Sequence, residues 1–386
     1  MKPDFKWPQV AGFRLARHYL FDRPQRKKSS RAELVSVCRD VCGIQAQLMT
    51  AAQTALWARL HNLNRTDLMT ALYQDRTLVK TSCMRQTLHL IPAVEFFVYI
   101  SALRKSRLQA LWRIMSRFGV TPKEAESMSA AVVAALRAGP LTQPELLEQI
   151  MPKAGRKMRK YLALVWSIQV FRPALVEGLI CYGPLRNKKE TFVLVDQWLP
   201  PRRRIPELEA QQILLRRYLS AFGPATLRDF SRWSGMTMPE VKAVHDLLKD
   251  ELSEVYVGDN NLLILRTDRD RLQDSHLADQ TLRLLPGFDP FMLGHVEKSH
   301  LVDSAHYKLV YRNQGWISPV ILLNGSVIGV WSNQRRGQHL SLRIEPFERL
   351  SKRIQSKIEA EAASLASFWE VSWDMQIAGS DTHSKR

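Results

Sequence analysis

Four cysteines are the residues of this chain best suited to bind a metal or to form crosslinks. Cys38 and Cys42 lie one helical turn apart and could supply two zinc ligands, but no second Cys or His pair follows at a suitable spacing. Apolar residues surround the pair at helical spacing, so we expect both thiols in a helical core. Four cysteines in 386 residues are also too few for a disulfide framework. Neither a metal nor an organic cofactor is expected.

A second pattern that could bind a ligand occupies residues 83–91, where Arg85, Thr87 and His89 take every second position. Side chains two residues apart in a strand share one face. A strand at 83–91 would therefore present all three side chains together, for example to a phosphate group. The same pattern fits a buried strand whose histidine has its hydrogen bonds satisfied, and both interpretations stay open.

The overall charge indicates a polyanionic partner. Lys and Arg number 56 against 37 for Asp and Glu, which gives a net charge of +19 and a pI near 10.0. Such an excess favours nucleic acid or an anionic membrane. The N-terminus lacks the apolar segment of a signal peptide, and no apolar run approaches the roughly 20 residues that span a bilayer. We expect a cytoplasmic, nucleoid-associated protein of bacterial type.

The positive charge is concentrated in residues 151–204, which contain twelve Lys or Arg and only three acids. A helix that binds a membrane surface needs exposed apolar residues opposite its cations. Here the apolar residues are needed for helical cores, which favours nucleic acid. The cations expected at a DNA backbone are Arg156, Lys157, Arg159 and Lys160 on a helix, Arg186, Lys188 and Lys189 at a hairpin turn, and Arg335 and Arg336 at a later turn.

The elements that must position these residues follow one repeated order. Residues 207–270 read as a helix, a short helix, a second helix and a β-hairpin, which is the order of a winged helix-turn-helix. The same order appears about 84 residues earlier, with helices expected at 125–137, 146–150 and 157–171 and strands at 174–182 and 191–195. A looser third copy covers residues 11–91, with strands at 78–81 and 83–91. A repeated unit is stronger support than one copy.

After Leu284 the hydrophobic pattern changes from a helical period to a strand period. Strands are expected at 319–323, 326–331 and 339–344, joined by an Asn324-Gly325 turn and the Arg335-Arg336-Gly337 turn. A long helix at 348–369 and a disordered tail from Ser380 follow. The pattern predicts an α+β chain that is mainly helical, divided at 1–120, 121–205, 206–284 and 285–386.

Four short motifs link the chain to a known family. They are residues 43–48 (GIQAQL), 84–90 (MRQTLHL), 285–290 (LPGFDP) and 327–331 (VIGVW). With the repeated helix-turn-helix pattern, the chain resembles the AlkZ-like tandem winged-helix DNA glycosylases, which include YcaQ, over roughly residues 10–370. The resemblance implies three winged-helix units followed by a C-terminal β-barrel-like domain in residues 285–386.

The resemblance also implies an activity and a partner. The expected activity is monofunctional excision of N7-alkylated purines from double-stranded DNA by a monomer, including the unhooking of interstrand crosslinks. The family's catalytic motif maps onto Gln45 and Gln47. For Arg85, Thr87 and His89 the functional interpretation of their alternation is contact with a phosphate or the damaged strand. The alternative is a non-catalytic winged-helix DNA-binding protein such as a transcription regulator, although a typical regulator carries one such motif per subunit and dimerises.

Two glutamines suit this chemistry only in a particular geometry. An amide is not a base near neutral pH, but an N7-alkylated purine already carries positive charge and leaves readily. Positioning a water and stabilising an oxocarbenium-like sugar remain, and amide oxygens can do both. Residues i and i+2 lie about 200° apart on a helix but on the same side of an extended chain. We therefore predict that Gln45 and Gln47 occupy a non-helical segment.

Other residues of the resemblance motifs are expected to be structural. Phe288 and Trp331, like Trp233, could stack on bases, but their apolar surroundings favour core packing. Asp289 precedes a proline in a loop, which favours an Asx turn.

Overall fold

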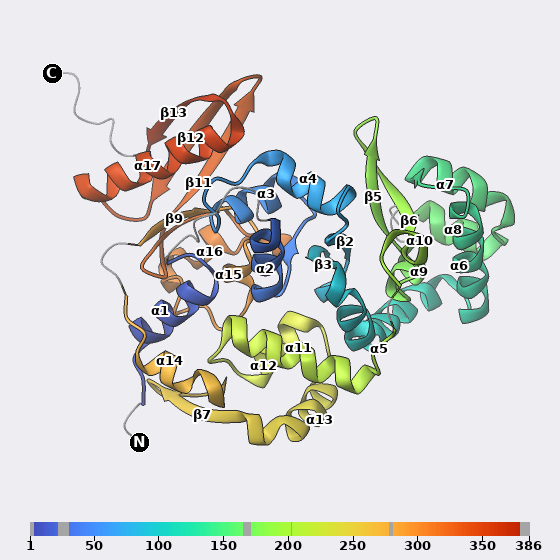
Figure 1. The fold of residues 1–386 in the computed structure, drawn as a ribbon, viewed down its shortest axis with the longest axis horizontal. Coiled ribbons are helices and arrows are strands. Elements are labelled where there is room, and N and C mark those ends of the chain that lie inside the picture. The colour runs from blue at the N-terminus through green and yellow to red at the C-terminus, as the bar shows by residue number, and fades with distance from the viewer. Residues whose placement is uncertain (1–3, 22–30, 165–170, 202, 278–280, 379–386) are drawn as a thin grey trace. The chain divides into compact units, whose positions relative to one another are not determined.

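The computed structural model describes residues 4–21, 31–164, 171–201, 203–277 and 281–378 (Figure 1). Its helices and strands form an α+β fold, as the sequence predicts. The chain divides into two compact units. Unit 1 comprises the described parts of Met1–Leu68, Arg216–Phe230 and Leu248–Arg386, and unit 2 comprises those of Met69–Leu215 and Ser231–Leu247. Every helix within the described ranges is too short or too polar to cross a lipid bilayer.

The helices and strands are numbered along the chain as in Figure 1. The helices are α1 (Trp7–Arg17), α2 (Arg31–Asp40), α3 (Met49–Trp57), α4 (Arg65–Tyr73), α5 (Phe96–Met115), α6 (Pro122–Leu136), α7 (Gln143–Ile150), α8 (Arg156–Leu164), α9 (Arg172–Val176), α10 (Val195–Trp198), α11 (Glu207–Phe222), α12 (Leu227–Ser234), α13 (Met238–Leu248), α14 (Arg269–Gln273), α15 (Pro290–Leu293), α16 (Tyr307–Val310) and α17 (Lys352–Trp369). The strands are β1 (Ile44–Gln45), β2 (Leu78–Ser82), β3 (Leu88–Pro92), β4 (Leu141–Thr142), β5 (Ile180–Arg186), β6 (Lys189–Leu194), β7 (Leu252–Val257), β8 (Asn260–Leu265), β9 (Leu282–Leu285), β10 (Val320–Leu323), β11 (Ser326–Arg336), β12 (His339–Pro346) and β13 (Ser372–Ile377).

Unit 1 contains a five-stranded sheet in the order β13-β12-β11-β10-β9. Its neighbouring strands are antiparallel except β12 and β13, which run parallel. The predicted Asn324-Gly325 turn joins β10 to β11, and both of its residues have positive φ, as a tight hairpin turn requires. Helix α17 packs on β9 and β13 (Figure 1). In the described residues β13 and β9 are the two edges of an open sheet, so the β-barrel-like domain expected at 285–386 does not contain a closed barrel there.

Unit 2 contains strands that neighbour one another in the order β3-β2-β5-β6-β4, each pair antiparallel. A buried cluster formed by α5 to α9 packs against β5 and β6. Aromatic rings lie within this cluster, where the Phe192 ring packs on the rings of Phe171 and Tyr182 with centroid distances of 4.8 and 4.9 Å. This core fixes the base of the β5–β6 hairpin, whose turn carries the basic residues predicted from the sequence.

The order of elements predicted for residues 207–270 is confirmed. Helices α11, α12 and α13 precede the antiparallel β7–β8 pair, with the turn at Gly258. A capping interaction precedes α13, since the Glu240 carboxylate accepts from the Thr237 backbone N–H at 2.8 Å. The assignment of three winged-helix units and the fourfold division of the chain stay predictions.

Two predicted strands were wrong in part. The strand expected at 174–182 begins only at Ile180, because Ala174 belongs to the short helix α9, which has Pro173 in its first turn. The strand expected at 83–91 begins at Leu88, because residues 84–86 form a tight helical turn. Part of the helix expected at 157–171 and the tail from Ser380 lie outside the described residues.

Candidate functional site

Gln45 and Gln47 lie in a non-helical segment, as predicted. Gln45 ends the short strand β1, and a bend follows before α3 begins at Met49. Gly43 precedes the strand with a φ of 87°, a conformation that glycine adopts readily, and it redirects the chain after α2. The Gln45 side chain is buried, whereas Gln47 is exposed.

The two amides meet directly. Gln45 Nε2 donates a hydrogen bond of 2.6 Å to Gln47 Oε1. This bond uses one donor of Gln45 and one acceptor position of Gln47, so Gln45 Oε1 and Gln47 Nε2 lie outside it. The pair therefore offers a carbonyl oxygen and an amide N–H₂ from adjacent side chains. Such a neutral pair can orient water and stabilise charge electrostatically, but it cannot remove a proton as a carboxylate would.

A buried ion pair anchors the helix that follows the glutamines. Arg59, just beyond the end of α3, donates two hydrogen bonds of 2.7 Å to the Asp289 carboxylate, and both side chains are fully buried at 0% exposure. Arg59 also donates to the Ala55 carbonyl in α3 at 2.8 Å. Asp289 Oδ1 accepts from the Phe291 backbone N–H at 2.9 Å, which caps α15. The Asx turn predicted at Asp289 is confirmed, and its carboxylate ties α3 to the 286–290 loop.

Arg85, Thr87 and His89 do not share the face of one strand, and that prediction was wrong. Arg85 and the following Gln86 have φ values of 50° and 64°, so the chain turns where a strand was expected. The Arg85 guanidinium donates to the Trp233 carbonyl, and Thr87 Oγ1 donates to the Met84 carbonyl at 3.0 Å. These bonds are internal to unit 2. Contact of these residues with DNA stays a prediction.

His89 fits the alternative of a buried, satisfied histidine. Its side chain is buried, and Nδ1 lies 3.0 Å from the Thr87 carbonyl oxygen. A carbonyl can only accept, so Nδ1 carries the proton. Burial, reinforced by the charge of Arg85, lowers the pKa of His89 to about 3. The ring is therefore neutral at physiological pH and provides no positive charge for a phosphate.

The other predicted cations lie on exposed surface of their own unit. All nine of these cations are exposed. They are Arg156, Lys157, Arg159 and Lys160 on α8, Arg186, Lys188 and Lys189 at the β5–β6 turn, and Arg335 and Arg336 at the β11–β12 turn. Arg159 donates to the Ala154 carbonyl at 2.8 Å, and Arg186 contacts the Glu145 carboxylate. Strand β11 continues through Arg335 and Arg336, so the β11–β12 hairpin is longer than the strand expected at 326–331 suggested.

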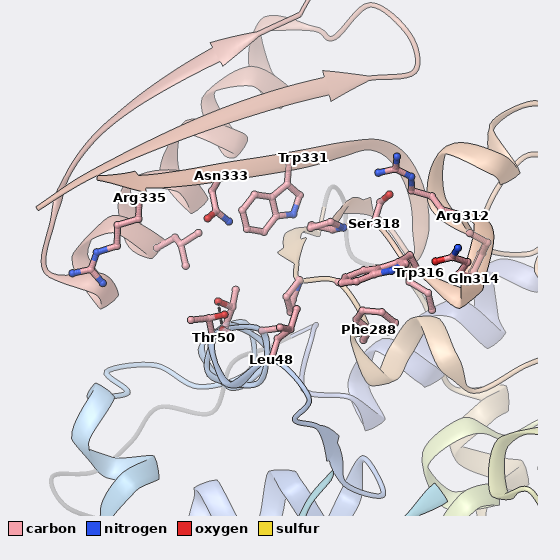
Figure 2. A pocket seen from close by; sticks show the side chains of 18 of the residues that line it. Leu48, Thr50, Phe288, Arg312, Gln314, Trp316, Ser318, Trp331, Asn333 and Arg335 are labelled. Atoms are coloured by element: carbon pink, nitrogen blue, oxygen red, sulfur yellow. Dashed lines mark hydrogen bonds between the residues drawn. The ribbon is translucent and has the colours of Figure 1, made fainter. Parts of the chain in front are cut away.

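A cavity that was not predicted from the sequence lies beside the glutamine segment. It has a volume of about 820 Å³ and is lined by residues of unit 1, beginning with Leu48, which follows Gln47 (Figure 2). Phe288 and Trp331 line it, together with Trp316 and Trp369. Trp331 is buried, as Trp233 is, and this confirms core packing for both. Phe288 is only half-buried and faces the cavity, so its assignment to the core was wrong. Five separate segments form the lining, and no local pattern could have revealed it.

Cys38 and Cys42 are buried, as expected for core thiols. Cys38, Cys42, Cys83 and Cys181 are all buried, and none of them forms a disulfide. Burial raises the pKa of Cys38 and of Cys83 to about 12, so both remain protonated at neutral pH. Across the described part of the chain, no group of three or more His, Cys, Asp or Glu residues is arranged to hold a metal ion.

The comparisons with known proteins all match DNA glycosylases. The family model described as DNA glycosylase AlkZ-like matches residues 38–368. A Streptomyces sahachiroi protein named interstrand DNA cross-link repair glycosylase is 31% identical over 369 residues, which cover 93% of this chain and 95% of that relative. The solved structure of Streptomyces sahachiroi DNA glycosylase AlkZ aligns with a TM-score of 0.83 and 29% identity, over 98% of this chain and 100% of that one.

Proposed function

Because this chain belongs to the AlkZ-like family of DNA glycosylases, we propose that it hydrolyses the N-glycosidic bond of N7-alkylated purines in double-stranded DNA. The related Streptomyces protein is named for repair of interstrand crosslinks, and we extend the proposal to crosslinks joined through N7. The observation that carries the proposal is the contact between Gln45 and Gln47 in a non-helical segment, which places two amides side by side at the predicted motif.

The proposed reaction requires little general acid or base catalysis from the protein. Alkylation at N7 leaves the purine cationic, so N9 can take the electron pair of the C1′–N9 bond and leave as a neutral base. A water oxygen then bonds to C1′, and one water proton passes to solvent. The charge that develops is the positive oxocarbenium character of the sugar, which a carbonyl dipole stabilises. No amine nucleophile takes part, which makes the proposed enzyme monofunctional.

The two amides take different parts in this proposal. Gln45 Oε1 lies outside the bond to Gln47 and is the acceptor that faces the developing charge or the attacking water. Its own amide N–H₂ is held by Gln47 Oε1, which fixes the flip state of the Gln45 side chain. Burial of Gln45 keeps competing solvent away from that carbonyl. Gln47 Nε2 is exposed with its side chain and donates to the water or to the sugar-phosphate backbone.

DNA binding in this proposal rests on the exposed cations. Those of α8 and of the β5–β6 turn would contact the phosphate backbone, as would Arg335 and Arg336 at the β11–β12 turn. Phosphate contacts hold a duplex without reading its sequence, which suits an enzyme that must find damage anywhere. We propose that the chain acts as a monomer with its winged-helix-like segments on one duplex.

A single-turnover assay tests the proposal. The substrate is a duplex with one N7-methylguanine, and alkali cleavage reveals the abasic site left by excision. We expect Gln45→Ala combined with Gln47→Ala to slow excision by at least about 100-fold, the usual loss when a transition-state dipole is removed, with little change in duplex affinity. The control combines Gln74→Ala and Gln273→Ala, two exposed glutamines outside the segment, and should match the unmodified enzyme.

Two results would contradict the proposal in different ways. Full activity of the double variant would remove the catalytic role of the glutamines. Failure of the unmodified protein to release base from N7-methylguanine and from an N7-linked crosslink would leave a non-catalytic winged-helix DNA-binding protein.

A further inference from the structure

The cavity beside the glutamine segment lies between α3 and the five-stranded sheet of unit 1. In Figure 2, Leu48 and Thr50 face Trp331 and Asn333 across the space, and Phe288 lies beside Trp316. Leu48 directly follows Gln47, so the cavity begins one residue beyond the catalytic motif of the proposed function. The cavity and the motif belong to the same unit.

The lining is aromatic, and several of its rings are held in place. Trp331 Nε1 donates to the Leu285 carbonyl at 2.9 Å, and the side chain is 3% exposed. The rings of Phe288 and Trp316 pack with centroids 5.3 Å apart. The Arg65 guanidinium lies 4.9 Å from the ring centroid of Trp369. Fixed aromatic faces favour a planar apolar ligand, which can stack without first having to order the site.

Large apolar side chains remain uncovered around this space. Trp316 is 52% exposed and Leu48 is 47% exposed. Within the described chain, three exposed cations, Lys308, Arg312 and Arg335, also line the cavity, and no carboxylate does. An aromatic group attached to a polyanion would complement both properties, since its ring would cover the apolar faces while phosphates meet the cations.

The size of the cavity indicates the kind of group that it holds. A volume of about 820 Å³ falls in the range of about 300–1,000 Å³ that encloses drug-sized ligands. A methyl group on a purine would leave almost all of this space empty. We propose that the cavity binds an aromatic substituent carried by an alkylated purine, so that aromatic adducts are preferred over small alkyl adducts. This inference rests on the proposed glycosylase function and specifies its substrate class.

The test uses two substrates that differ only in the group of interest. Each duplex carries one N7-guanine half-adduct of a nitrogen mustard, with the second arm hydrolysed. One mustard bears an N-methyl group and the other bears an N-phenyl group. Single-turnover excision and binding by fluorescence anisotropy are measured for both duplexes, and the readout is the phenyl-to-methyl ratio of each quantity.

Two variants perturb the cavity in opposite ways. Trp316→Ala removes a half-exposed ring that can stack, and Asn333→Trp fills the space from an exposed strand position. Trp373→Ala is the matched control, because Trp373 is an exposed tryptophan of the same sheet outside the cavity lining. Thermal unfolding of each variant shows that it is folded.

We expect the unmodified protein to prefer the phenyl adduct by roughly 5- to 150-fold, the usual range for one aromatic stacking contact. Both cavity variants should bring the ratio close to one while leaving the methyl adduct within about twofold of the unmodified protein, and Trp373→Ala should keep the preference. A ratio that is unchanged in both cavity variants, or equally lost in Trp373→Ala, overturns the inference. If neither duplex is excised, the proposed function fails, and the anisotropy ratio still decides whether the cavity binds the ring.

Discussion

The buried pair of Arg59 and Asp289 gives a stability prediction that the structure quantifies. Asp289→Asn keeps an oxygen that can cap α15, but it removes the charge that faces a guanidinium with 0% exposure. Breaking a buried ion pair from one side costs about 3–5 kcal/mol, because the remaining charge is left uncompensated. We expect a loss of this size in the free energy of unfolding, measured by urea titration with tryptophan fluorescence.

An exposed pair that also forms two hydrogen bonds provides the control. Arg216 and Glu251 also form two hydrogen bonds of 2.7 Å, but both side chains are more than a third exposed. Glu251→Gln should therefore cost no more than about 1 kcal/mol. Combining Arg59→Met with Asp289→Asn should cost about 1–3 kcal/mol less than the sum of the single variants, since removing both charges leaves neither unpaired. The reasoning is refuted if Asp289→Asn costs no more than Glu251→Gln, or if the two buried substitutions are additive.

Three further predictions concern charge, pH and backbone. Neutralising Lys188 and Lys189 together should reduce the slope of log Kd for duplex DNA against log salt by about 2, because each phosphate contact contributes about 0.9. Lys352→Ala with Arg353→Ala, on α17, is the control. An equal effect of the control would show that the β5–β6 turn is not the particular site of DNA binding. His89 has a lowered pKa of about 3 in the folded state, so below about pH 6.5 the unfolded chain binds a proton that the folded chain does not. This histidine should therefore lower the free energy of unfolding by up to about 1.4 kcal/mol per pH unit as the pH falls from about 6.5 towards 3. His89→Asn should reduce that slope in urea titrations at several pH values, whereas His276→Asn, on the surface, should not. Gly325→Ala should lower the melting temperature more than Gly337→Ala. Both glycines have positive φ, but of the two only Gly325 would place a Cβ against another side chain, with Ala11 Cβ at 2.9 Å. Equal losses in melting temperature would show that backbone conformation alone is responsible.

Elements with strong local chemistry were predictable from the sequence. The Asn324-Gly325 turn adopts the positive φ values that this dipeptide favours. The non-helical backbone of Gln45 and Gln47 was predicted from the requirement that residues two apart face the same way. In both cases the deciding information lies within a few residues of the feature.

Elements decided by distant contacts were not predictable. Alternation at 83–91 favoured one strand, yet Arg85 and Gln86 turn the chain. The Arg85 guanidinium reaches the Trp233 carbonyl, and Gln86 Oε1 accepts from Arg172 at 2.8 Å. These partners lie 148 and 86 residues away in the sequence, so the periodicity of nine residues could not report them. Strand β13 escaped prediction for another reason, because most of its residues are exposed and no apolar alternation marks it.

The two halves of the candidate site depend on different kinds of information. The amide pair is local, since a single short segment supplies both side chains and the bond between them. The cavity is assembled from α3, the 286–288 segment, the 308–319 region, β11 with β12, and α17. A relative could therefore change Trp316 or Asn333 and alter the cavity without touching Gln45 or Gln47. This separation is the reason to assign bond hydrolysis to the amides and the choice of adduct to the cavity.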